Sequence, residues 1–435
     1  MVLNLCTNDT NLNQDIMTPI ETKVHSELGE LEGVILHTPG QELENMTPDN
    51  AERALYSDIL NLSVAREEYG QFAGVLNKVT RTFQVMDLLE GILEKDEVRQ
   101  KLIDKICKFE NVDNIKGELL QLKSGELARQ LIEGVTLKKN TLTTFLCDER
   151  FSLRPLHNFF FTRDASVTTY DRVLISKMAN RVRAREAIIM EAIFNNSPLI
   201  RTSTYSPFDI NRDDRHVTIE GGDVIIARDD ITVIGNSART TTRGVDFMVD
   251  QLKKKRTRHY IVVQQLPHTP ESFIHLDMVF TLLNVNECMV YEPVIFHSAQ
   301  LKTITITVDN GEVISIETKD NLLAALKELG LDMKPIMCGG TKDIWLQERE
   351  QWHSGANFFA IAPGKVMGYE RNVHTMEEMS NNGYEILRAV DILSGNVNLD
   401  DHKKFVVTIE GSELSRGGGG ARCMSMPVRR KDVEW

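Results

Sequence analysis

Four segments of this 435-residue chain share one pattern, in which β-forming residues lie on both sides of a short polar turn. The segments begin at Asp164, Asp223, Asp277 and Asn357, so each one starts with a short polar side chain. A fifth candidate lies at residues 31–40. A strand-turn-strand unit that recurs along a chain is typical of a repeat wound about a centre. The sequence therefore predicts a β-rich repeat in which each unit offers one polar residue to a shared cavity.

Helical patterns connect these units and, in one place, interrupt them. Residues 183–194 and 321–329 have apolar side chains at helical spacing between the β-rich segments. Between residues 88 and 148 the chain becomes rich in Leu, Lys and Glu and contains no proline. We expect this block, 88–148, to form an α-helical subdomain inserted into a catalytic α/β domain made of residues 1–87 and 149–435. Its apolar stripes favour packing between helices over a groove for a partner.

Net charge and composition limit the class of partner. The chain carries 63 acidic and 50 basic residues, which gives a formal net charge of −13. Because nucleic-acid binding depends on basic surface, we expect no nucleic-acid partner, and a small cationic substrate suits the charge better. The first residues show no basic segment followed by an apolar one, and no later stretch approaches the roughly 18 apolar residues that suggest a membrane span. We therefore expect a cytoplasmic protein without membrane contact.

Cysteine usage argues against both a disulfide framework and a zinc site. The six cysteines are scattered, and no two of them form a Cys-x-x-Cys pair. Because the sequence also has neither a His/Cys cluster nor an Asp-rich ion-binding loop, we expect no metal and no cofactor. The default interpretation is six free thiols, at positions Cys6, Cys107, Cys147, Cys288, Cys338 and Cys423.

Cys423 differs from the other cysteines because it follows a glycine-rich turn. The run from Gly417 to Gly420 weakens helix and strand alike, so it indicates close approach of the backbone to a ligand. A flexible linker is the alternative, but residues 423–428 are mostly apolar and are expected to be buried. We therefore interpret Cys423 as a candidate nucleophile.

Carboxylates and a histidine at the starts of three hairpins are expected to meet this thiol. Strand alternation would place His275 and Asp277 on one face, although such a pair alone is more often a surface or core hydrogen bond. Glu220 and Asp164 lie at the starts of the second and first hairpins. Converging carboxylates are costly unless a cation balances them. With no metal motif, a guanidinium is the simpler ligand, because its five N–H donors can pair with two carboxylates while its central carbon faces sulfur.

Taken in order, several motifs make the sequence resemble an arginine deiminase, a member of the guanidino-group-modifying superfamily. The resemblance covers nearly the whole chain except the helical insert. It implies a five-bladed pseudosymmetric α/β propeller into which a helical domain is inserted, and hydrolysis of L-arginine to L-citrulline and ammonia in the arginine dihydrolase pathway. The matching motifs are residues 26–40, 158–164, 219–223, 275–280 and 422–427.

The resemblance also implies a role for each residue of the reacting centre. Cys423 would be the nucleophile that forms a covalent amidino-thioether, and His275 the general acid and base. Asp164 and Asp277 would bind the guanidinium, and Glu220 would assist at the same end.

Five further residues are implied to line the amino-acid portion of the substrate. They are Asn158, Phe161, Arg183, Arg239 and Gly417, with the two arginines facing the α-carboxylate.

Two positions in this part of the site stay open. Arg181 or Arg185 could take the place of Arg183. Some relatives carry arginine where this chain has Gly418, so that contact is either missing or supplied by Arg416 or Arg422.

Other functions compete with this interpretation. An amidinotransferase, or a hydrolase of agmatine or methylated arginine, uses a similar set of Cys, His and carboxylates. Agmatine lacks the carboxylate that Arg183 and Arg239 would bind, so these arginines favour arginine. A non-catalytic arginine-binding protein of the same fold is the alternative from another class, although the intact set of five reactive residues argues against it. We also expect a homo-oligomer, in which the helical insert is a candidate contact.

Overall fold

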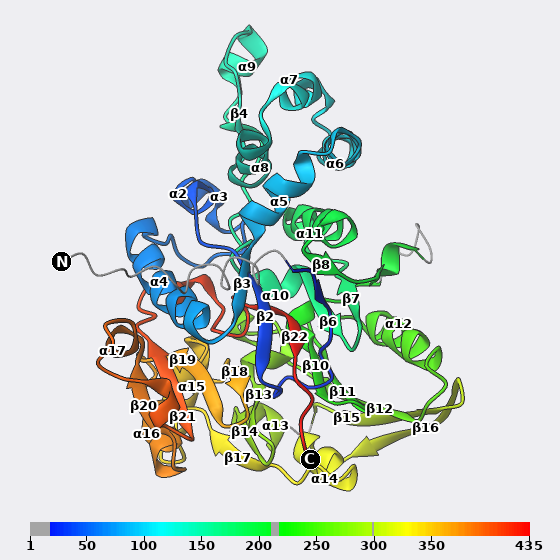
Figure 1. The fold of residues 1–435 in the computed structure, drawn as a ribbon, viewed down its shortest axis with the longest axis vertical. Helices are drawn as coiled ribbons and strands as arrows, with labels where there is room; N and C mark the ends of the chain where they lie inside the picture. The colour runs from blue at the N-terminus through cyan, green and yellow to red at the C-terminus, as the bar shows by residue number, and fades with distance from the viewer. Residues whose placement is uncertain (1–17, 210–216, 298–299) are drawn as a thin grey trace, which may run out of the picture.

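The computed structural model describes residues 18–209, 217–297 and 300–435, which form a mixed α/β fold (Figure 1). Five of its sheets repeat one pairing pattern. A central strand pairs with one neighbour in antiparallel orientation and with the other neighbour in parallel orientation. The five sets are β2 (Leu31–Leu36), β22 (Met426–Arg430) and β3 (Arg81–Gln84); β6 (Ser166–Thr169), β7 (Arg172–Ile175) and β9 (Thr204–Tyr205); β10 (Val224–Arg228), β11 (Ile231–Asn236) and β12 (His259–Gln265); β13 (Phe280–Asn284), β14 (Glu287–Val290) and β17 (Lys334–Met337); and β18 (Phe359–Ala362), β19 (Lys365–Tyr369) and β21 (Phe405–Ile409).

Other strands extend two of these sheets or form small pairs. The hairpin of β15 (Thr303–Asp309) and β16 (Glu312–Lys319) continues the sheet of β12, and β20 (Glu385–Arg388) lies parallel to β21. Two short pairs are β1 (Ile20–Glu21) with β8 (Ile200–Arg201), and β4 (Val135–Thr136) with β5 (Phe151–Leu153).

All four predicted hairpins form, but the polar residues at their starts do not lie in strands. Asp164 belongs to the short helix α10 (Thr162–Ala165), and Asp223 and Asp277 lie in 3-10 turns. The prediction that strand alternation aligns residues 275 and 277 is therefore wrong. His275 is extended and the chain then turns, because the N–H of Leu276 is held by the buried carboxylate of Asp223 at 2.9 Å.

The fifth candidate segment also differs from a hairpin. Its strand, β2, is followed by Thr38, Pro39 and Gly40, which lead into the short helix α2 (Gln41–Glu44). The antiparallel partner of β2 is β22, the last strand of the chain. The two ends of the fold thus complete one sheet together, and this pairing holds the segment after Cys423 in place.

Residues 85–146 are mainly helical and protrude from one end of the sheets (Figure 1). The apolar stripes expected there, including Leu102, Ile106 and Leu131, are buried in a cluster that also contains residues of α11. They pack inside the structure and are not available to a partner. The helices are α5 (Val85–Leu93), α6 (Asp96–Glu110), α7 (Lys116–Gln121), α8 (Ser124–Glu133) and α9 (Leu142–Leu146), with the 3-10 turn η1 (Asp113–Ile115).

The remaining helices connect or cover the sheets. The sequence pattern at 183–194 and 321–329 corresponds to α11 (Ala184–Asn196) and α14 (Leu322–Glu328). The others are α3 (Pro48–Ala51), α4 (Leu62–Val79), α12 (Thr242–Lys253), α13 (Glu292–Ile295), α15 (Ile344–Trp352), α16 (Val373–Asn381) and α17 (Ala389–Leu393), and the 3-10 turns η2 (Arg181–Arg183), η3 (Pro207–Asp209), η4 (Gly221–Asp223), η5 (Glu271–Phe273), η6 (Leu276–Met278), η7 (Leu399–Asp401) and η8 (Leu414–Gly417).

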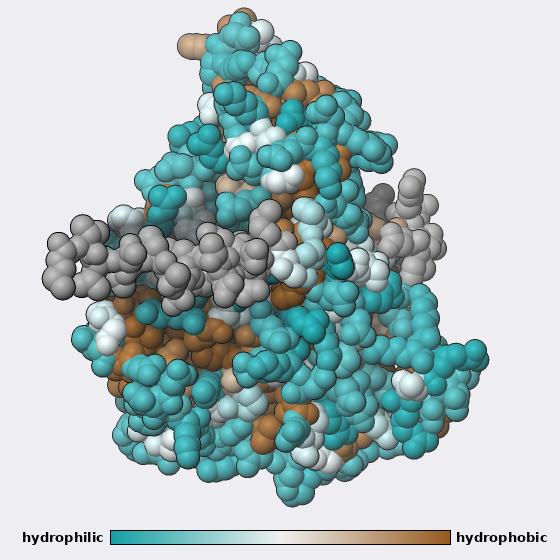
Figure 2. Space-filling view, in the orientation of Figure 1, coloured by the Kyte–Doolittle hydropathy of each residue, from teal (hydrophilic) through white to brown (hydrophobic). Residues whose placement is uncertain are grey.

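The face that Figure 2 shows is mostly hydrophilic, with apolar side chains at the tip formed by α9 and a larger apolar area in the lower left of the view. Leu142, Phe145 and Leu146 of this helix are 75 %, 68 % and 69 % exposed. Across the three described ranges, no helix combines the length and apolar character that crossing a bilayer requires.

One buried carboxylate on α4 holds the chain as it approaches Cys423. Glu68 is fully buried and accepts hydrogen bonds from the backbone N–H groups of Ser412, Glu413 and Leu414, and from the Ser412 hydroxyl. Arg371 binds the same segment through the Ser412 carbonyl. Buried N–H groups need partners, so Glu68 sets the path of the loop before the glycines.

We predict that Glu68→Ala destabilises the fold, because it leaves several buried N–H groups without an acceptor. The free energy of unfolding should fall by about 3 kcal/mol, measured as a lower midpoint in urea unfolding. Glu67→Ala, at the neighbouring exposed position of α4, is the matched control and should leave the midpoint nearly unchanged. Equal midpoints for the two variants would contradict this role of Glu68.

Candidate active site

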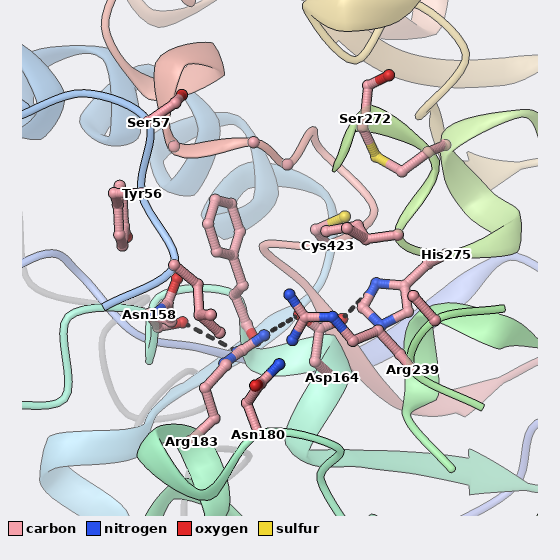
Figure 3. A pocket seen from close by; sticks show the side chains of 18 of the residues that line it. Tyr56, Ser57, Asn158, Asp164, Asn180, Arg183, Arg239, Ser272, His275 and Cys423 are labelled. Carbon is pink, nitrogen blue, oxygen red and sulfur yellow. Dashed lines mark hydrogen bonds and ion pairs between the residues drawn. The ribbon is translucent and has the colours of Figure 1, made fainter. Parts of the chain in front are cut away.

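The predicted site residues converge on one cavity of about 300 Å³ (Figure 3). Glu220 and Asp277 lie behind its wall, and both are fully buried. Gly418 and Arg416 also line the cavity, whereas neither Arg181 nor Arg185 is among its lining residues. The lining includes all the other predicted positions: Asn158, Phe161, Asp164, Arg183, Arg239, His275, Gly417 and Cys423.

The glycine run is required by close packing at the cavity wall. A Cβ atom on Gly419 would lie 2.5 Å from the ring of Phe161, and one on Gly420 would lie 2.7 Å from the side chain of Asn357. Gly418 has a φ of +80°, in the left-handed region that other residues rarely adopt. The loop therefore packs against Phe161 and leads directly to Cys423, so the glycines are not a flexible linker. Close approach of this backbone to a ligand stays a prediction.

Cys423 is a buried thiol in a negative environment. Its sulfur lies 3.6 Å from Oδ2 of Asp277 and 3.2 Å from Nδ2 of Asn357, and the residue is 2 % exposed. Burial and the charges of Asp277 and Asp164 raise the pKa of the thiol well above its usual value. The thiol is therefore protonated near neutral pH while no cation occupies the cavity. The other described cysteines are also free thiols, and Cys6 lies outside the described residues.

His275 is held as an imidazolium by two carboxylates. Its Nε2 lies 2.9 Å from Oε2 of Glu220, and its Nδ1 lies 3.6 Å from Oδ1 of Asp164. Burial by itself lowers the pKa of His275, but the charge of Asp164 and the hydrogen bond with Glu220 outweigh it and raise the pKa to about 9. Burial likewise opposes the charge of Glu220, yet His275 and Arg239 lower the pKa of that carboxyl to about 2. The pair is charged at neutral pH.

Arg183 is fully engaged by protein groups in this structure. Its Nη1 lies 2.6 Å from Oδ2 of Asp164, and its Nη2 lies 2.7 Å from Oε2 of Glu186. Burial disfavours the charge of Arg183, but Glu186 and Asp164 overcome it and raise its pKa. Arg183 lines the cavity, as a residue that binds the substrate carboxylate would, but its N–H groups already donate to Asp164, Glu186 and backbone carbonyls. Binding of the substrate carboxylate by Arg183 stays a prediction.

A second arginine balances Asp277. Nη1 of Arg422 lies 2.8 Å from Oδ2 of Asp277, and Nη2 of the same guanidinium lies 2.9 Å from Oε1 of Glu27. Arg416 instead pairs with Asp58 and Glu413. Of the two arginines proposed to compensate for Gly418, Arg422 therefore supports the carboxylate next to the sulfur, and Arg416 lies along the cavity.

Four buried atoms of the predicted site residues have no hydrogen-bond partner in the part of the chain that the structure describes. They are Oδ1 of Asp164, Oδ1 of Asp277, Nδ1 of His275 and Nη1 of Arg239. Buried polar atoms are rarely left unpaired, and each such atom needs an explanation. The two acceptors belong to the carboxylates nearest the thiol. One donor belongs to Arg239, which lines the same cavity, and the other to His275, whose Nδ1 forms an ion pair with Oδ1 of Asp164 at 3.6 Å. This set complements a ligand with a cation at one end and an anion at the other.

Two residues that organise the site were predicted only as hairpin starts facing a shared cavity, with no role assigned, and neither of them lines the cavity. Asn357 contacts the sulfur of Cys423, and its signal was its place as the polar residue before the fourth hairpin. Asp223 occupies the corresponding place in the second hairpin. It accepts from the N–H of Leu276 at 2.9 Å and from the hydroxyl of Ser237 at 2.6 Å. Burial raises the pKa of Asp223 to about 7, although His275 opposes that rise.

No grouping of three His, Cys, Asp or Glu side chains that could hold a metal ion occurs in the ranges that the structure describes. The charged groups of the cavity are balanced by arginines and by His275.

Solved structures share this fold at low sequence identity. The N-terminal domain of ArgZ, an arginine dihydrolase from the ornithine-ammonia cycle in cyanobacteria, is 11 % identical with a TM-score of 0.51, over 92 % of this chain and 97 % of that one. SxtG, an amidinotransferase from Microseira wollei, is 12 % identical with a TM-score of 0.51, over 95 % of this chain and 98 % of that one. These likenesses identify the fold alone.

Sequence comparison is more specific. An arginine deiminase from Oenococcus oeni and one from Bacillus cereus are each 32 % identical to this chain over 428 residues, covering 94 % of this chain and 98 % of each relative. A family model described as arginine deiminase matches residues 52–430. The chain therefore belongs to the arginine deiminase family.

Proposed function

We propose that this protein hydrolyses L-arginine to L-citrulline and ammonia through a covalent intermediate on Cys423. The observation that carries the proposal is the set of buried atoms, at the cavity and behind its wall, that have no hydrogen-bond partner among the described residues. Oδ1 of Asp164 and Oδ1 of Asp277 can accept from a guanidinium beside the thiol, and Nη1 of Arg239 can donate to a carboxylate. Family membership and the names of the relatives support the same reaction.

Substrate binding prepares the nucleophile. The guanidinium lies between Asp164 and Asp277, which places its central carbon next to the sulfur of Cys423. Its positive charge offsets the two carboxylates that raise the pKa of the thiol, so the thiol loses its proton when the substrate is bound. Without substrate the sulfur stays protonated near neutral pH.

The first half of the reaction releases ammonia. The thiolate attacks the guanidinium carbon and forms a C–S bond, and a tetrahedral intermediate results. His275, which carries a proton at neutral pH, transfers it to one terminal nitrogen. The C–N bond to that nitrogen breaks, ammonia departs, and a cationic amidino-thioether remains on Cys423.

The second half restores the enzyme. His275 is now neutral and removes a proton from water, and the resulting hydroxide attacks the same carbon. The C–S bond breaks, the sulfur leaves as thiolate, and the added hydroxyl group gives up its proton to water, so the former guanidinium becomes the ureido group of citrulline. Glu220 stabilises each protonated state of His275 through the 2.9 Å contact at Nε2.

The lining residues distinguish this proposal from its alternatives. Agmatine lacks the carboxylate that Arg239 is placed to bind, and an amidinotransferase needs an acceptor amine in place of water. Asn158, Phe161 and Gly417 line the part of the cavity proposed for the amino-acid portion of arginine. The intact reactive set of Cys423, His275 and the carboxylates disfavours an arginine-binding protein without catalysis.

We further propose that the five sheets are the blades of a pseudosymmetric propeller and that residues 88–148 are a helical insert in it. The repeated pairing of the five sheets supports the first point, and the protruding helices support the second. A cytoplasmic location and a homo-oligomer are also proposed. The exposed apolar residues of α9, and not the buried stripes of the insert, are the surface that favours self-association.

Cys423→Ala should abolish citrulline formation while arginine still binds, because the variant removes the nucleophile and keeps the carboxylates. The measurements are colorimetric citrulline assay and isothermal titration calorimetry. Cys288→Ala, which removes a buried thiol from the core, is the matched control and should keep near wild-type turnover. Turnover by Cys423→Ala near the wild-type rate would remove Cys423 from the nucleophile role.

The pH dependence of kcat/KM should follow His275. Because the imidazole must begin protonated and its pKa is raised to about 9, activity should fall as pH rises through about 9. Glu220→Gln removes a carboxylate that favours the imidazolium, so the alkaline fall should move to lower pH. A profile that rises steadily through pH 10 in the wild type, or an unshifted fall in Glu220→Gln, would contradict this role.

Arg239→Ala should weaken selection for the substrate carboxylate. Loss of charge-assisted hydrogen bonds worth about 3 kcal/mol predicts a KM for arginine roughly 10²-fold higher. The low activity expected with agmatine should change little, so the ratio of kcat/KM for arginine to kcat/KM for agmatine should fall. Arg258→Ala, which removes an exposed arginine paired with Asp309, is the control. An unchanged KM for arginine would exclude Arg239 from carboxylate binding.

A further inference from the structure

Asn357 is joined to the nucleophile from two sides. Its Nδ2 lies 3.2 Å from the sulfur of Cys423 and 3.1 Å from the backbone carbonyl of Asp277. Its Oδ1 accepts from the N–H of Arg422 at 2.9 Å and from the N–H of Cys423 at 3.2 Å. Asn357 is 1 % exposed and does not line the cavity, so its side chain forms these contacts with protein atoms and is not exposed to a ligand in the cavity.

The hydrogen-bond network determines which way the amide faces. The N–H groups of Arg422 and Cys423 are donors, so the atom that meets them must be the oxygen of Asn357. The carbonyl of Asp277 is an acceptor, so it requires the amide nitrogen on the other side. The N–H group that points toward the sulfur is therefore fixed by three backbone groups, independently of the sulfur itself.

The charges around Cys423 explain why an amide suits this position. The carboxylates of Asp277, on η6, and Asp164, on α10, disfavour a negative sulfur. Arg422, in the same loop as the thiol, favours it. Arg163 of α10 and His275 are the other cations of this region, and the hydroxyl of Tyr369 on β19 is directed at Gly419.

The four polar residues that precede the hairpins thus divide into two chemical types. Asp164, Asp223 and Asp277 are carboxylates, and Asn357 is the one amide among them. A carboxylate at 357 would accept from the two N–H groups equally well. It would, however, place a further negative charge against the sulfur and could not donate to it. A neutral side chain that accepts on one side and donates on the other meets both requirements.

We propose that Asn357 is a further catalytic residue, whose side-chain N–H donates to the sulfur of Cys423 and stabilises the thiolate that attacks the guanidinium carbon. This inference rests on the proposed function of the same site. Asn357 acts on a reacting atom, and its oxygen also fixes the backbone on which that atom is carried. The backbone N–H of Gly420 is a second donor to the sulfur and accounts for activity that remains without Asn357.

The test uses Asn357→Asp and Asn357→Ala in the full-length protein. The aspartate keeps the acceptor for both N–H groups and loses the donor, and the alanine loses the donor without adding charge. Both should reduce kcat by about 10² to 10³, the usual effect of removing one donor to a developing anion. The KM for arginine should change much less.

A second measurement reports on the thiol without arginine turnover. The rate at which iodoacetamide alkylates Cys423 is followed against pH by mass spectrometry of the peptide that contains it. The midpoint of this profile should rise by about one pH unit or more in Asn357→Ala and further in Asn357→Asp, because the thiolate has lost its donor. If the wild type alkylates as expected but forms no citrulline, the proposed function fails and the role of Asn357 at the sulfur is still measured.

Binding separates a chemical role from a structural one. In the Cys423→Ala background, Asn357→Asp should bind arginine within about threefold of the parent, by calorimetry. Asn372→Asp is the matched control, because Asn372 is also 1 % exposed and donates to a backbone carbonyl, that of His353. It should leave the alkylation midpoint unchanged.

Three results would overturn the proposal. The first is a wild-type kcat in both Asn357 variants. The second is an unshifted alkylation midpoint in Asn357→Ala. The third is loss of arginine binding when Asn357→Asp is added to Cys423→Ala. The last two would assign Asn357 to holding the loop alone. If Asn357→Asp does not fold, the kcat and the alkylation midpoint of Asn357→Ala decide the question.

Discussion

The site depends on carboxylates that are buried beside a thiol and balanced by arginines from the protein itself. A buried carboxylate without a cation is strongly disfavoured, and removing one member of such a pair leaves an uncompensated charge. Here Asp164 is paired with Arg183, and Asp277 with Arg422. In each pair the second carboxylate oxygen, Oδ1, has no hydrogen-bond donor among the described residues, although that of Asp164 lies 3.6 Å from Nδ1 of His275. The same interactions therefore keep the free protein stable and keep acceptors ready for a guanidinium.

This charge balance also keeps the nucleophile at rest. With the cavity empty, burial and two carboxylates oppose ionisation of Cys423, whereas His275 already carries its proton. A bound guanidinium reverses the first effect and leaves the second in place. In the proposed reaction, Cys423 and His275 are therefore in the required protonation states together only when the substrate is bound, which limits reaction of the thiol with other electrophiles.

Closure of the fold brings these groups together. Two strands that precede the helical block and the strand after Cys423 form one sheet, because β22 and β3 both pair with β2. The path of the chain before Cys423 is set by Glu68 on α4, and the backbone of Cys423 itself by Asn357. Residues distant in sequence thus hold the glycine-rich loop against Phe161, and no local preference of the loop would do so.

Alternation of β-forming residues and turns is a local property, so the sequence alone determined the four hairpins and the helical character of the block near residue 100. It also selected Cys423, His275, Asp164, Asp277 and Glu220 as candidate reactive residues. It misjudged the backbone at residues 275–277, because the turn there depends on Asp223, which lies far away in the chain. Only the tertiary structure decided that Arg183 is engaged by Asp164 and Glu186, that Arg422 supports Asp277, and that Asn357 faces the sulfur. These are pairings between distant charged or polar groups, and their partners are selected by burial, which a linear pattern does not record.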